Sequence, residues 1–328
     1  MRAAFIEQVG PPENIHYGEL PTPQRGPTDM LVDVLCTTVN SVDTLIRSGV
    51  YRVPMAFPFV IGRDLVGRIA AMGWGSSEFR VGDLVWCNSL GHGGRQGAAA
   101  GQVVVPADRL YHLPDGVDPA DAVTVLHPAA TAYLALFTHG QLRVGETMLV
   151  AGAAGNVGSA LVTMAVAAGA RTIATASEGD TEYCRSLGAS RVFDYRDPNL
   201  LQQVRDSCPN GVDVYVDTSG RNELTFAIDV LAERGRIILF AGSRSQPALP
   251  VIALFQKSGS IHGFVISDAT TAELAAAARE VNRLLAAGRL RPRHIERRPL
   301  SDAAEVHRRL ERGELRDRRV VLEITEQP

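Results

Sequence analysis

The stretch "AGAAGNVGSALVTMAVAAGAR", residues 151–171, decides the fold. It reads as the end of a buried strand followed directly by an uncharged helix. Gly155 and Gly158 stand where a dinucleotide-binding loop has its second and third glycines, which admit the pyrophosphate and let the helix pack closely. Ala153 replaces the first glycine, which is tolerable if the turn keeps φ negative. The stretch predicts a dinucleotide-binding loop, and the alternative is a structural βα turn without a ligand.

Strands and helices alternate on both sides of this loop, from about residue 121 onward. Repeated βα units predict a parallel sheet with helices on both faces. The expected strands are 147–152, 171–177, 191–195, 212–220 and 235–243, and the expected helices are 156–169, 181–188, 199–207 and 223–233.

The two flanks have a different character. The first third holds short valine-, leucine- and isoleucine-rich runs between Gly, Pro and Asp clusters, which favours an antiparallel barrel or sandwich. The tail predicts a helix over 270–288 with Thr270 and Glu273 as its capping box, a second helix from about 301 and a strand over 318–326. The α/β middle is therefore inserted into the other domain, and we expect domains over 1–120 with 264–328, and over 121–263.

Bulk properties exclude several classes of protein. The 328 residues suffice for two domains, and a net charge of −3 gives no global attraction to nucleic acid or membrane. The four cysteines have no C-x-x-C spacing, so we expect no disulfide framework and a cytoplasmic location. Residues 148–170 carry no charge and are long enough to span a bilayer, but their glycines favour a buried strand and helix.

The end of the second expected strand bears on the cofactor. A carboxylate there would hold the ribose 2′-hydroxyl of NAD, whereas Ser177 leaves room for the 2′-phosphate of NADPH. Glu178 and Asp180 follow, and their charge would repel that phosphate. Side chains that could compensate are Arg185, Tyr195 and Arg196. The sequence favours NADPH and leaves NADH open.

Five segments carry a family resemblance: "VNSVDTLIRSGVY" (39–51), "FPFVIGRDLVGRIAAMG" (57–73), "VGDLVW" (81–86), "HPAATAYLAL" (127–136) and "GAAGNVG" (152–158). In this order they resemble the zinc-free quinone oxidoreductase, or zeta-crystallin-like, branch of the medium-chain dehydrogenases/reductases, whose glycine loop also has this alanine. The resemblance implies a GroES-like β-barrel catalytic domain plus a doubly wound Rossmann nucleotide-binding domain. It also implies a homodimer, and a cleft between the domains for the nicotinamide.

Zinc-dependent relatives have a cysteine in the early block and a His-Glu pair in the next. Here "TTVNSVD" has no cysteine, and Arg63 and Asp64 stand at the pair. The segment "CNSLGHGGRQGAAAG" has one cysteine where a structural zinc site needs four ligands, so Cys87 and His92 read as an ordinary loop. We expect no metal.

Three residues are candidates for the chemistry by resemblance. Asn40 would bond the substrate oxygen or the nicotinamide ribose, unless it is a turn asparagine. Tyr51 would donate a hydrogen bond or a proton, unless it is a packed loop residue. Thr131 would lie near the nicotinamide, unless it is a plain helix threonine.

The sequence also predicts roles for four other polar residues. His127, before Pro128 at an expected helix start, is read as an acid or as a capping residue. Asp43 and Arg47 are one helical turn apart and are expected to pair with each other or with the loop. Lys257 is read as a surface residue.

The expected cofactor site gathers residues that follow strands, because open α/β sheets bind ligands at the carboxyl ends of their strands. Arg221 would reach the adenosine side, and a phosphate contact from Arg318 or Arg319 is in doubt. The predicted cofactor-binding residues are Ala154, Gly155, Asn156, Val157, Ser177, Tyr195, Ser219, Ala241, Gly242, Phe264 and Val265.

Together these features predict a zinc-independent, NADPH-dependent reductase that transfers hydride to a quinone or an α,β-unsaturated carbonyl. One alternative is an enoyl reductase for a CoA- or carrier-bound thioester. The other is a non-catalytic cofactor-binding protein of the same fold. We expect a small-molecule substrate and no nucleic-acid or membrane partner.

Overall fold

The computed structural model describes residues 1–75, 78–242 and 246–324, in two compact units. The first unit is Met1–His127 with Leu274–Pro328, and the second is Pro128–Glu273. Both divisions fall a little after the boundaries expected from the sequence. Residues 325 and 326 of the expected last strand, and residue 243 of an earlier one, lie outside the described residues.

The second unit is built on one parallel sheet of six strands. Their order is β11-β10-β9-β12-β13-β14, so the chain moves outward in one direction from β9 and in the other from β12. This is the doubly wound arrangement that the sequence predicts. The strands are β9 (Thr147–Ala151), β10 (Arg171–Ala176), β11 (Arg191–Asp194), β12 (Val212–Asp217), β13 (Leu231–Leu239) and β14 (Ser260–Gly263).

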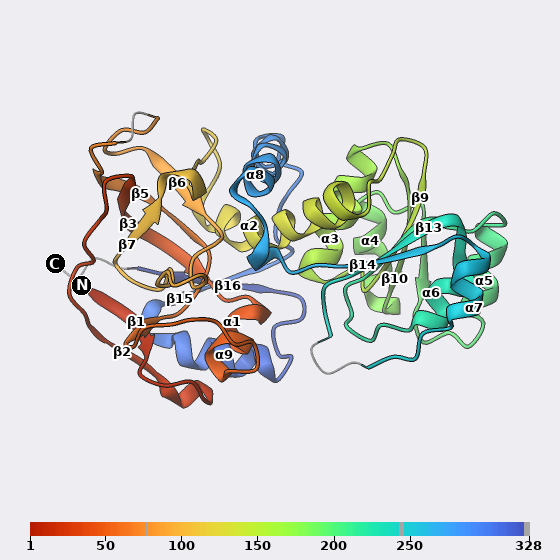
Figure 1. The fold of residues 1–328 in the computed structure, drawn as a ribbon, viewed down its shortest axis with the longest axis horizontal. Helices are drawn as coiled ribbons and strands as arrows, with labels where there is room; N and C mark the ends of the chain where they lie inside the picture. Colours follow the sequence, from red (N-terminus) through yellow and green to blue (C-terminus); the bar gives the residue numbers. More distant parts are fainter. Residues whose placement is uncertain (76–77, 243–245, 325–328) are drawn as a thin grey trace. The chain divides into compact units, whose positions relative to one another are not determined.

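Helices cover both faces of this sheet, with α3 and α4 on one face and α5, α6 and α7 on the other (Figure 1). Residues 148–170 form β9, the loop and a twelve-residue helix, as expected. The described helix long and apolar enough to cross a membrane is instead Pro119–His139, but 78% of its most apolar window is buried within the protein. We interpret it as a core helix. The helices are α2 (Pro119–Tyr133), α3 (Asn156–Ala167), α4 (Thr181–Ser186), α5 (Leu200–Ser207), α6 (Leu224–Val230) and α7 (Val251–Gln256).

The expected helix over 223–233 is too long. It ends at Val230, because Leu231 already pairs with Val212 in the sheet. A register shift then accommodates the next residues before β13 rejoins β12. Lys257, read as a surface residue, lies at this point, and its Nζ donates to the carbonyls of Ile228 (2.7 Å) and Leu231 (2.6 Å). The lysine thus satisfies carbonyls that the end of α6 leaves without helical partners.

The first unit is mainly antiparallel, as predicted. Its larger sheet runs β15-β16-β3-β5-β6-β8, with β7 also paired to β3, and a smaller sheet runs β2-β1-β4. The strands are β1 (Arg2–Ile6), β2 (Ile15–Glu19), β3 (Asp29–Thr38), β4 (Phe59–Val60), β5 (Leu65–Met72), β6 (Leu84–Cys87), β7 (Gln102–Pro106), β8 (Tyr111–His112), β15 (Ile295–Pro299) and β16 (Arg319–Glu323).

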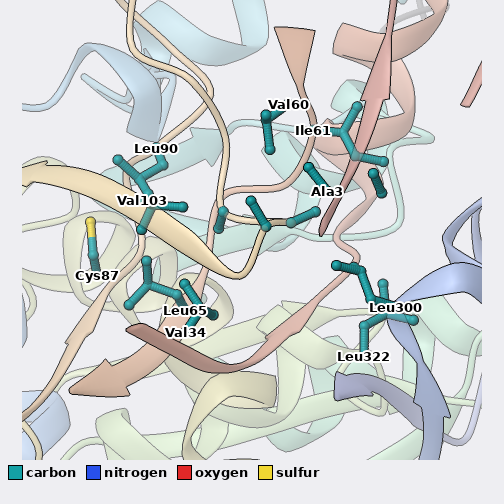
Figure 2. Close-up of a cluster of buried hydrophobic side chains, with 14 of the residues drawn as sticks. Ala3, Val34, Val60, Ile61, Leu65, Cys87, Leu90, Val103, Leu300 and Leu322 are labelled. Carbon is teal, nitrogen blue, oxygen red and sulfur yellow. The ribbon is translucent and has the colours of Figure 1, made fainter. Parts of the chain in front are cut away.

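The core of the first unit draws on both ends of the chain. Figure 2 shows Ala3, Val34 and Leu65 from early strands in one cluster with Leu300 and Leu322. Three helices complete the unit: α1 (Ser41–Ser48), α8 (Thr271–Ala286) and α9 (Ala303–Glu311). The predicted capping box of α8 is confirmed, because the amides of Thr270 and Glu273 each bond the other's side chain.

Candidate functional site

The glycine loop lies at the carboxyl end of β9, beside the end of β12. Gly152 has a φ of +81°, in the left-handed region that favours glycine. The Thr218 hydroxyl donates to the carbonyls of Ala151 (2.8 Å) and Gly152 (3.0 Å), which joins the two strand ends. Ala153 is buried and does not have a positive φ, so the conformation expected for alanine is confirmed.

The other two glycines of the loop serve different purposes. A Cβ on Gly158 would lie 2.3 Å from the Gly152 oxygen and 2.8 Å from the Ala153 Cα, so glycine is needed here for α3 to pack. A Cβ on Gly155 would meet only the Gly152 oxygen, at 3.4 Å, which is an ordinary contact. Because Gly155 is exposed and no protein atom crowds it, packing does not require a glycine here, and the position leaves room for a ligand to approach the backbone.

The first turn of α3 places backbone donors beside Gly155. Gly155 is the N-cap of α3, with no side-chain cap, and Asn156 and Val157 are the first two helical residues. The first amides of a helix have no partner inside it, and the helix dipole adds partial positive charge there. The predicted residues Ala154, Gly155, Asn156 and Val157 surround this end, which suits a pyrophosphate.

Ser177 and Tyr195, predicted to bind the cofactor, lie side by side at the ends of β10 and β11. The Tyr195 amide donates to the carbonyl of Ala176 over 3.2 Å, next to Ser177. The Ser177 hydroxyl donates to Oδ2 of Asp180 over 2.5 Å. The carboxylate of Asp180 therefore lies against Ser177, the residue that was predicted to leave room for a 2′-phosphate.

Two arginines lie on the ring of Tyr195. The guanidinium carbons of Arg196 and Arg221 are 5.0 Å and 5.3 Å from its centroid. Arg196 also donates to the Tyr195 hydroxyl from Nε (3.2 Å) and Nη2 (3.0 Å), and this contact raises the pKa of Arg196. Arg185 instead lies 3.8 Å from Glu182 on α4. The positive charge at this edge thus comes from Arg196 and Arg221.

A buried carboxylate that the sequence did not single out organises the turn after β12. Oδ1 of Asp217 accepts from the amide (2.6 Å) and the hydroxyl (2.7 Å) of Ser219, and Oδ2 accepts from the amide of Asn222 (2.7 Å). The Asn222 side chain donates to the carbonyl of Ala241 over 3.0 Å. The predicted residues Ser219, Ala241 and Gly242 therefore share one connected edge. An acid at the end of a strand, before "TSG", was the available signal.

Phe264 and Val265 follow the edge strand β14. The ring of Phe264 stacks on His139, with centroids 4.5 Å apart, and lies 5.3 Å from the ring of Phe240. Val265 is 43% exposed. All predicted cofactor residues thus follow carboxyl ends of the six parallel strands, where their order in the sheet brings them to one edge.

Thr131 and His127 both lie inside α2. Thr131 is 5% exposed. His127 was expected at a helix start, but α2 begins at Pro119, and Pro128 is accommodated in its interior. Burial, together with the charge of Arg63, lowers the pKa of His127 to about 3. It is therefore neutral near pH 7, which removes the reason for reading it as an acid.

In the first unit, Asn40 joins a buried polar cluster. Its Nδ2 donates to Oδ2 of Asp64 over 2.7 Å, and its Oδ1 accepts from Nη2 of Arg319 over 2.8 Å. Its amide donates to Oδ2 of Asp43 over 2.7 Å. Asn40 is 4% exposed, so its side chain acts first to fix its neighbours. Arg319 is buried in this cluster, which is at odds with a phosphate contact.

Of the two alternatives expected for Asp43 and Arg47, no contact between them is found among the described residues, and each instead bonds a loop backbone group, at Asn40 and Gly10. Arg47 instead reaches Glu311 on α9 and the carbonyl of Gly10, because these elements pack directly against α1. Asp43 is buried against the start of its own helix, and burial raises its pKa to about 6.

Tyr51 lies half-buried after α1. Its amide donates to the carbonyl of Leu45 over 3.0 Å, and its ring stacks nearly parallel on His92, with centroids 6.3 Å apart.

The side chains at this cluster do not fit a zinc ion. A guanidinium has no lone pair for a metal, and Asn40 is already bonded at both ends. Among the described residues no group of three His, Cys, Asp or Glu side chains could hold a metal. All four cysteines are buried, and no disulfide joins them among the described residues.

Comparison with known proteins places the chain in a family. The alcohol dehydrogenase GroES-like domain matches residues 26–115, and the zinc-binding dehydrogenase model matches residues 156–283. The quinone oxidoreductase of Rattus norvegicus is 31% identical over 313 residues, which cover 94% of this chain and 93% of the relative. The chain belongs to the medium-chain dehydrogenase/reductase superfamily. The family resemblance predicted from the sequence is thus confirmed. Its similarity to quinone oxidoreductases supports the assignment of this superfamily member as an oxidoreductase.

Solved structures extend the match to the whole fold. A mycobacterial protein solved in complex with NADPH has a TM-score of 0.85 at 29% identity, and covers 98% of this chain and 99% of its own. A structure described as an NAD-dependent alcohol dehydrogenase has a TM-score of 0.88 at 29% identity, covering 99% of this chain and 100% of its own. The GroES-like and Rossmann architecture of this superfamily member is therefore confirmed.

Proposed function

We propose that the protein is a zinc-independent, NADPH-dependent reductase of quinones or α,β-unsaturated carbonyl compounds. The observation that carries this is the empty space at Gly155, beside the first turn of α3 at the point where the sheet reverses its winding. A dinucleotide pyrophosphate fits there, and the rat relative at 31% identity is a quinone oxidoreductase.

The chain offers a place for each part of the dinucleotide. Ala154 to Val157 would hold the pyrophosphate, and Ser177 and Tyr195 would meet the adenine ribose. The nicotinamide half would lie against Ser219, Ala241, Gly242, Phe264 and Val265. When bound, the reduced cofactor supplies the hydride.

The choice of NADPH rests on Arg196 and Arg221. Both guanidinium groups lie on Tyr195, beside the end of β10, where a 2′-phosphate would arrive. Asp180 opposes this choice, because its carboxylate is bonded to Ser177. Glu178, Asp194 and Glu223 also lie close to these arginines and offset part of their charge. We favour NADPH because both guanidinium groups lie on Tyr195 at this edge, and because the mycobacterial structure holds NADPH.

The substrate class follows from the chemistry of hydride addition. Hydride forms a C–H bond at the electron-poor carbon, the conjugated π bond breaks toward oxygen, and the substrate gains two electrons as the dihydronicotinamide loses them. Hydrogen-bond donors then stabilise the negative oxygen until a proton arrives. We assign Tyr51 as a donor to this oxygen, Asn40 to positioning its buried cluster, and Thr131 to the nicotinamide.

A thioester enoyl reductase and a non-catalytic cofactor-binding protein remain the competing readings. Calorimetry with NADPH and NADH, followed by turnover of naphthoquinone, methyl vinyl ketone and crotonyl-CoA, separates the three. We expect tighter binding of NADPH and turnover of the quinone or the ketone. Turnover of crotonyl-CoA alone supports the thioester reading, and binding without any turnover supports the non-catalytic one.

We further propose a cytoplasmic homodimer that joins through β14. This strand is at the edge of the described sheet, and an unpaired edge invites another strand. Next to it α7 exposes Val251 (57%), Ile252 (65%) and Phe255 (62%), an apolar surface of the kind that marks interfaces.

A further inference from the structure

The first unit has a surface cavity of about 400 Å³ that the proposed reaction does not use. It lies between the segment that follows β2, the strand β7 and the loop that leads to Gly97. Every residue that lines it belongs to Met1–His127, so the cavity is complete within one unit. Cavities that hold small organic molecules have volumes of roughly 300–1,000 Å³, and this one falls in that range.

The walls of the cavity are mainly apolar. Figure 2 shows two of the lining residues, Val60 and Val103, in the core cluster of this unit, where each is 4% exposed. Other apolar lining residues come from the segment after β2 and from β7: Leu20, Pro21, Pro23, Val104 and Pro106. An apolar ligand that covered these side chains would remove them from water, which favours binding.

Two glutamines on the lining already have partners at both ends of their amides. Gln96 accepts from the amide of Val60 over 2.7 Å and donates to two carbonyls. Gln102 accepts from the hydroxyl of Thr22 over 3.2 Å and donates to Oδ1 of Asp33 over 2.8 Å. These amides hold the walls together and are not left for a ligand.

Arg95 is different, because this half-buried lining residue has a donor to spare. Its Nε (3.4 Å) and Nη2 (3.2 Å) donate to the carbonyl of Ser89, but Nη1 makes no hydrogen bond among the described residues and is not fully buried. None of the ion pairs found in the described part of the chain includes Arg95. Burial lowers the pKa of the Arg95 guanidinium, and the charge of Arg109 lowers it further. A carboxylate is the partner that such a guanidinium bonds most strongly.

The acids near the cavity leave this position to a ligand. Asp108 is exposed and acts on Arg95 less than Arg109 does. Asp29 lines the cavity, but it pairs with Pro106 at the far end of β7 and is not among the main charges that act on Arg95. An anionic group bonded to Arg95 therefore lies away from the acid on the lining.

We propose that this cavity binds a carboxylate with an apolar body, a medium-chain fatty acid in its simplest form, whose head accepts a hydrogen bond from Nη1 of Arg95. The hydrocarbon body covers the valine, leucine and proline side chains of the walls. All predicted cofactor residues belong to the other unit, so this inference does not rest on the proposed function. One charge-assisted hydrogen bond in a mainly apolar cavity distinguishes a carboxylate from an alcohol of the same length.

The plain alternative is a water-filled crevice in which Arg95 is hydrated. Arg25→Met is the matched control for Arg95→Met. Arg25 follows Gln24 of the lining without lining the cavity itself, and its Nε donates to the carbonyl of Met72 over 3.0 Å. Both variants remove one positive charge from the same unit. A third variant, Val104→Phe, fills the cavity without changing the charge.

The test is calorimetry on the whole protein with decanoate and with 1-decanol, its uncharged analogue. We expect the wild type to bind decanoate about tenfold more tightly than decanol, and Arg95→Met to bind the two alike. Arg25→Met should bind decanoate as the wild type does, and Val104→Phe should bind neither compound. In addition, NMR of decanoate labelled with ¹³C at its carboxyl group should give a pKa for the bound acid below that of the free acid in the wild type, but not in Arg95→Met.

Each other outcome contradicts the inference at a defined point. A wild type that does not bind decanoate, or binds both compounds equally, indicates a water-filled crevice. Unchanged binding in Arg95→Met overturns the role of Arg95, and unchanged binding in Val104→Phe places the ligand outside the cavity. Equal weakening in Arg25→Met indicates attraction by surface charge alone. If Arg95→Met does not fold, the two ligands on the wild type and on Val104→Phe still decide.

Failure of the proposed function gives a separate result. Calorimetry with NADPH and turnover of a quinone or an enone are measured on the same wild-type protein. If both are absent while decanoate binds as expected, the proposed function is contradicted and the carboxylate site stands.

Discussion

The Ser177 hydroxyl is bonded to the Asp180 carboxylate over 2.5 Å, at the end of β10. The small side chain that was predicted to leave room for a 2′-phosphate therefore binds an acid at the same position. Across from it, Arg196 and Arg221 lie on Tyr195. If the proposed function is correct, we expect the preference between NADPH and NADH to depend on this balance of charge, so that substitutions on either side should shift it.

Replacing Asp180 with Asn should strengthen NADPH binding. The change removes a negative charge beside the expected phosphate and keeps a hydrogen-bond acceptor for Ser177. We expect the Kd for NADPH to fall about fivefold at low salt, and the Kd for NADH to change little. Fluorescence titration of both cofactors measures the effect. An equal gain for both would place Asp180 away from the phosphate.

Gly155 and Gly158 should respond in opposite ways to a side chain. At Gly155 valine has room, so Gly155→Val should leave the melting temperature nearly unchanged but weaken NADPH binding by more than about tenfold. At Gly158 a Cβ would clash with the Gly152 oxygen, so Gly158→Ala should destabilise the protein by about 1–3 kcal/mol. Thermal melts and calorimetry on the pair test this. Intact cofactor binding in Gly155→Val would contradict the proposed phosphate site.

Asp64 should make stability depend on pH. Its folded pKa, about 8, lies above the value near 4 of an exposed aspartate, so the folded state binds the proton more tightly. Between these values the free energy of unfolding should fall as pH rises, by about 1.4 kcal/mol per unit from this group. Asp64→Asn should remove this dependence, so that its free energy of unfolding rises relative to that of the wild type as the pH increases from about 4 to about 8. Urea denaturation at several pH values measures the difference, and parallel curves would refute the assignment.

Phe255 should hold two copies of the chain together. Phe255→Glu puts a charge in the exposed apolar face of α7, and we expect it to turn the dimer into a monomer. Val144→Glu is the matched control, because Val144 is 84% exposed and lies outside α7. Sedimentation velocity distinguishes the two. A wild type that is monomeric at high concentration would end the proposal.

The parts of the fold that follow from local sequence could be predicted. The loop at Gly155 and the capping box at Thr270 depend on residues only a few positions apart, and both are found. The helix over 223–233 was drawn too long because its end is decided by pairing of Leu231 with Val212, which composition does not show. Local propensity was overridden by the sheet.

The site residues divide in the same way. The position of the predicted cofactor residues at one edge of the sheet could be predicted, because parallel strands bring their carboxyl ends to one edge; their role in binding stays a prediction. The partners of Asn40 and Arg47 were missed because Arg319 and Glu311 lie 279 and 264 positions away in the chain. Only the packing of α9 and β16 in the folded protein places Glu311 beside Arg47 and Arg319 beside Asn40.

The pairing of β16 with β3 also has a consequence for the making of the protein. Thr38 and Val320, which bond across these strands, are 282 positions apart. At ordinary rates of translation, on the order of 15–60 s therefore pass between the synthesis of β3 and that of β16. The whole second unit emerges in that interval and finds its own sheet complete. During synthesis the part of β3 that pairs with β16 is therefore an open sheet edge, available to other chains until the last strand has been made.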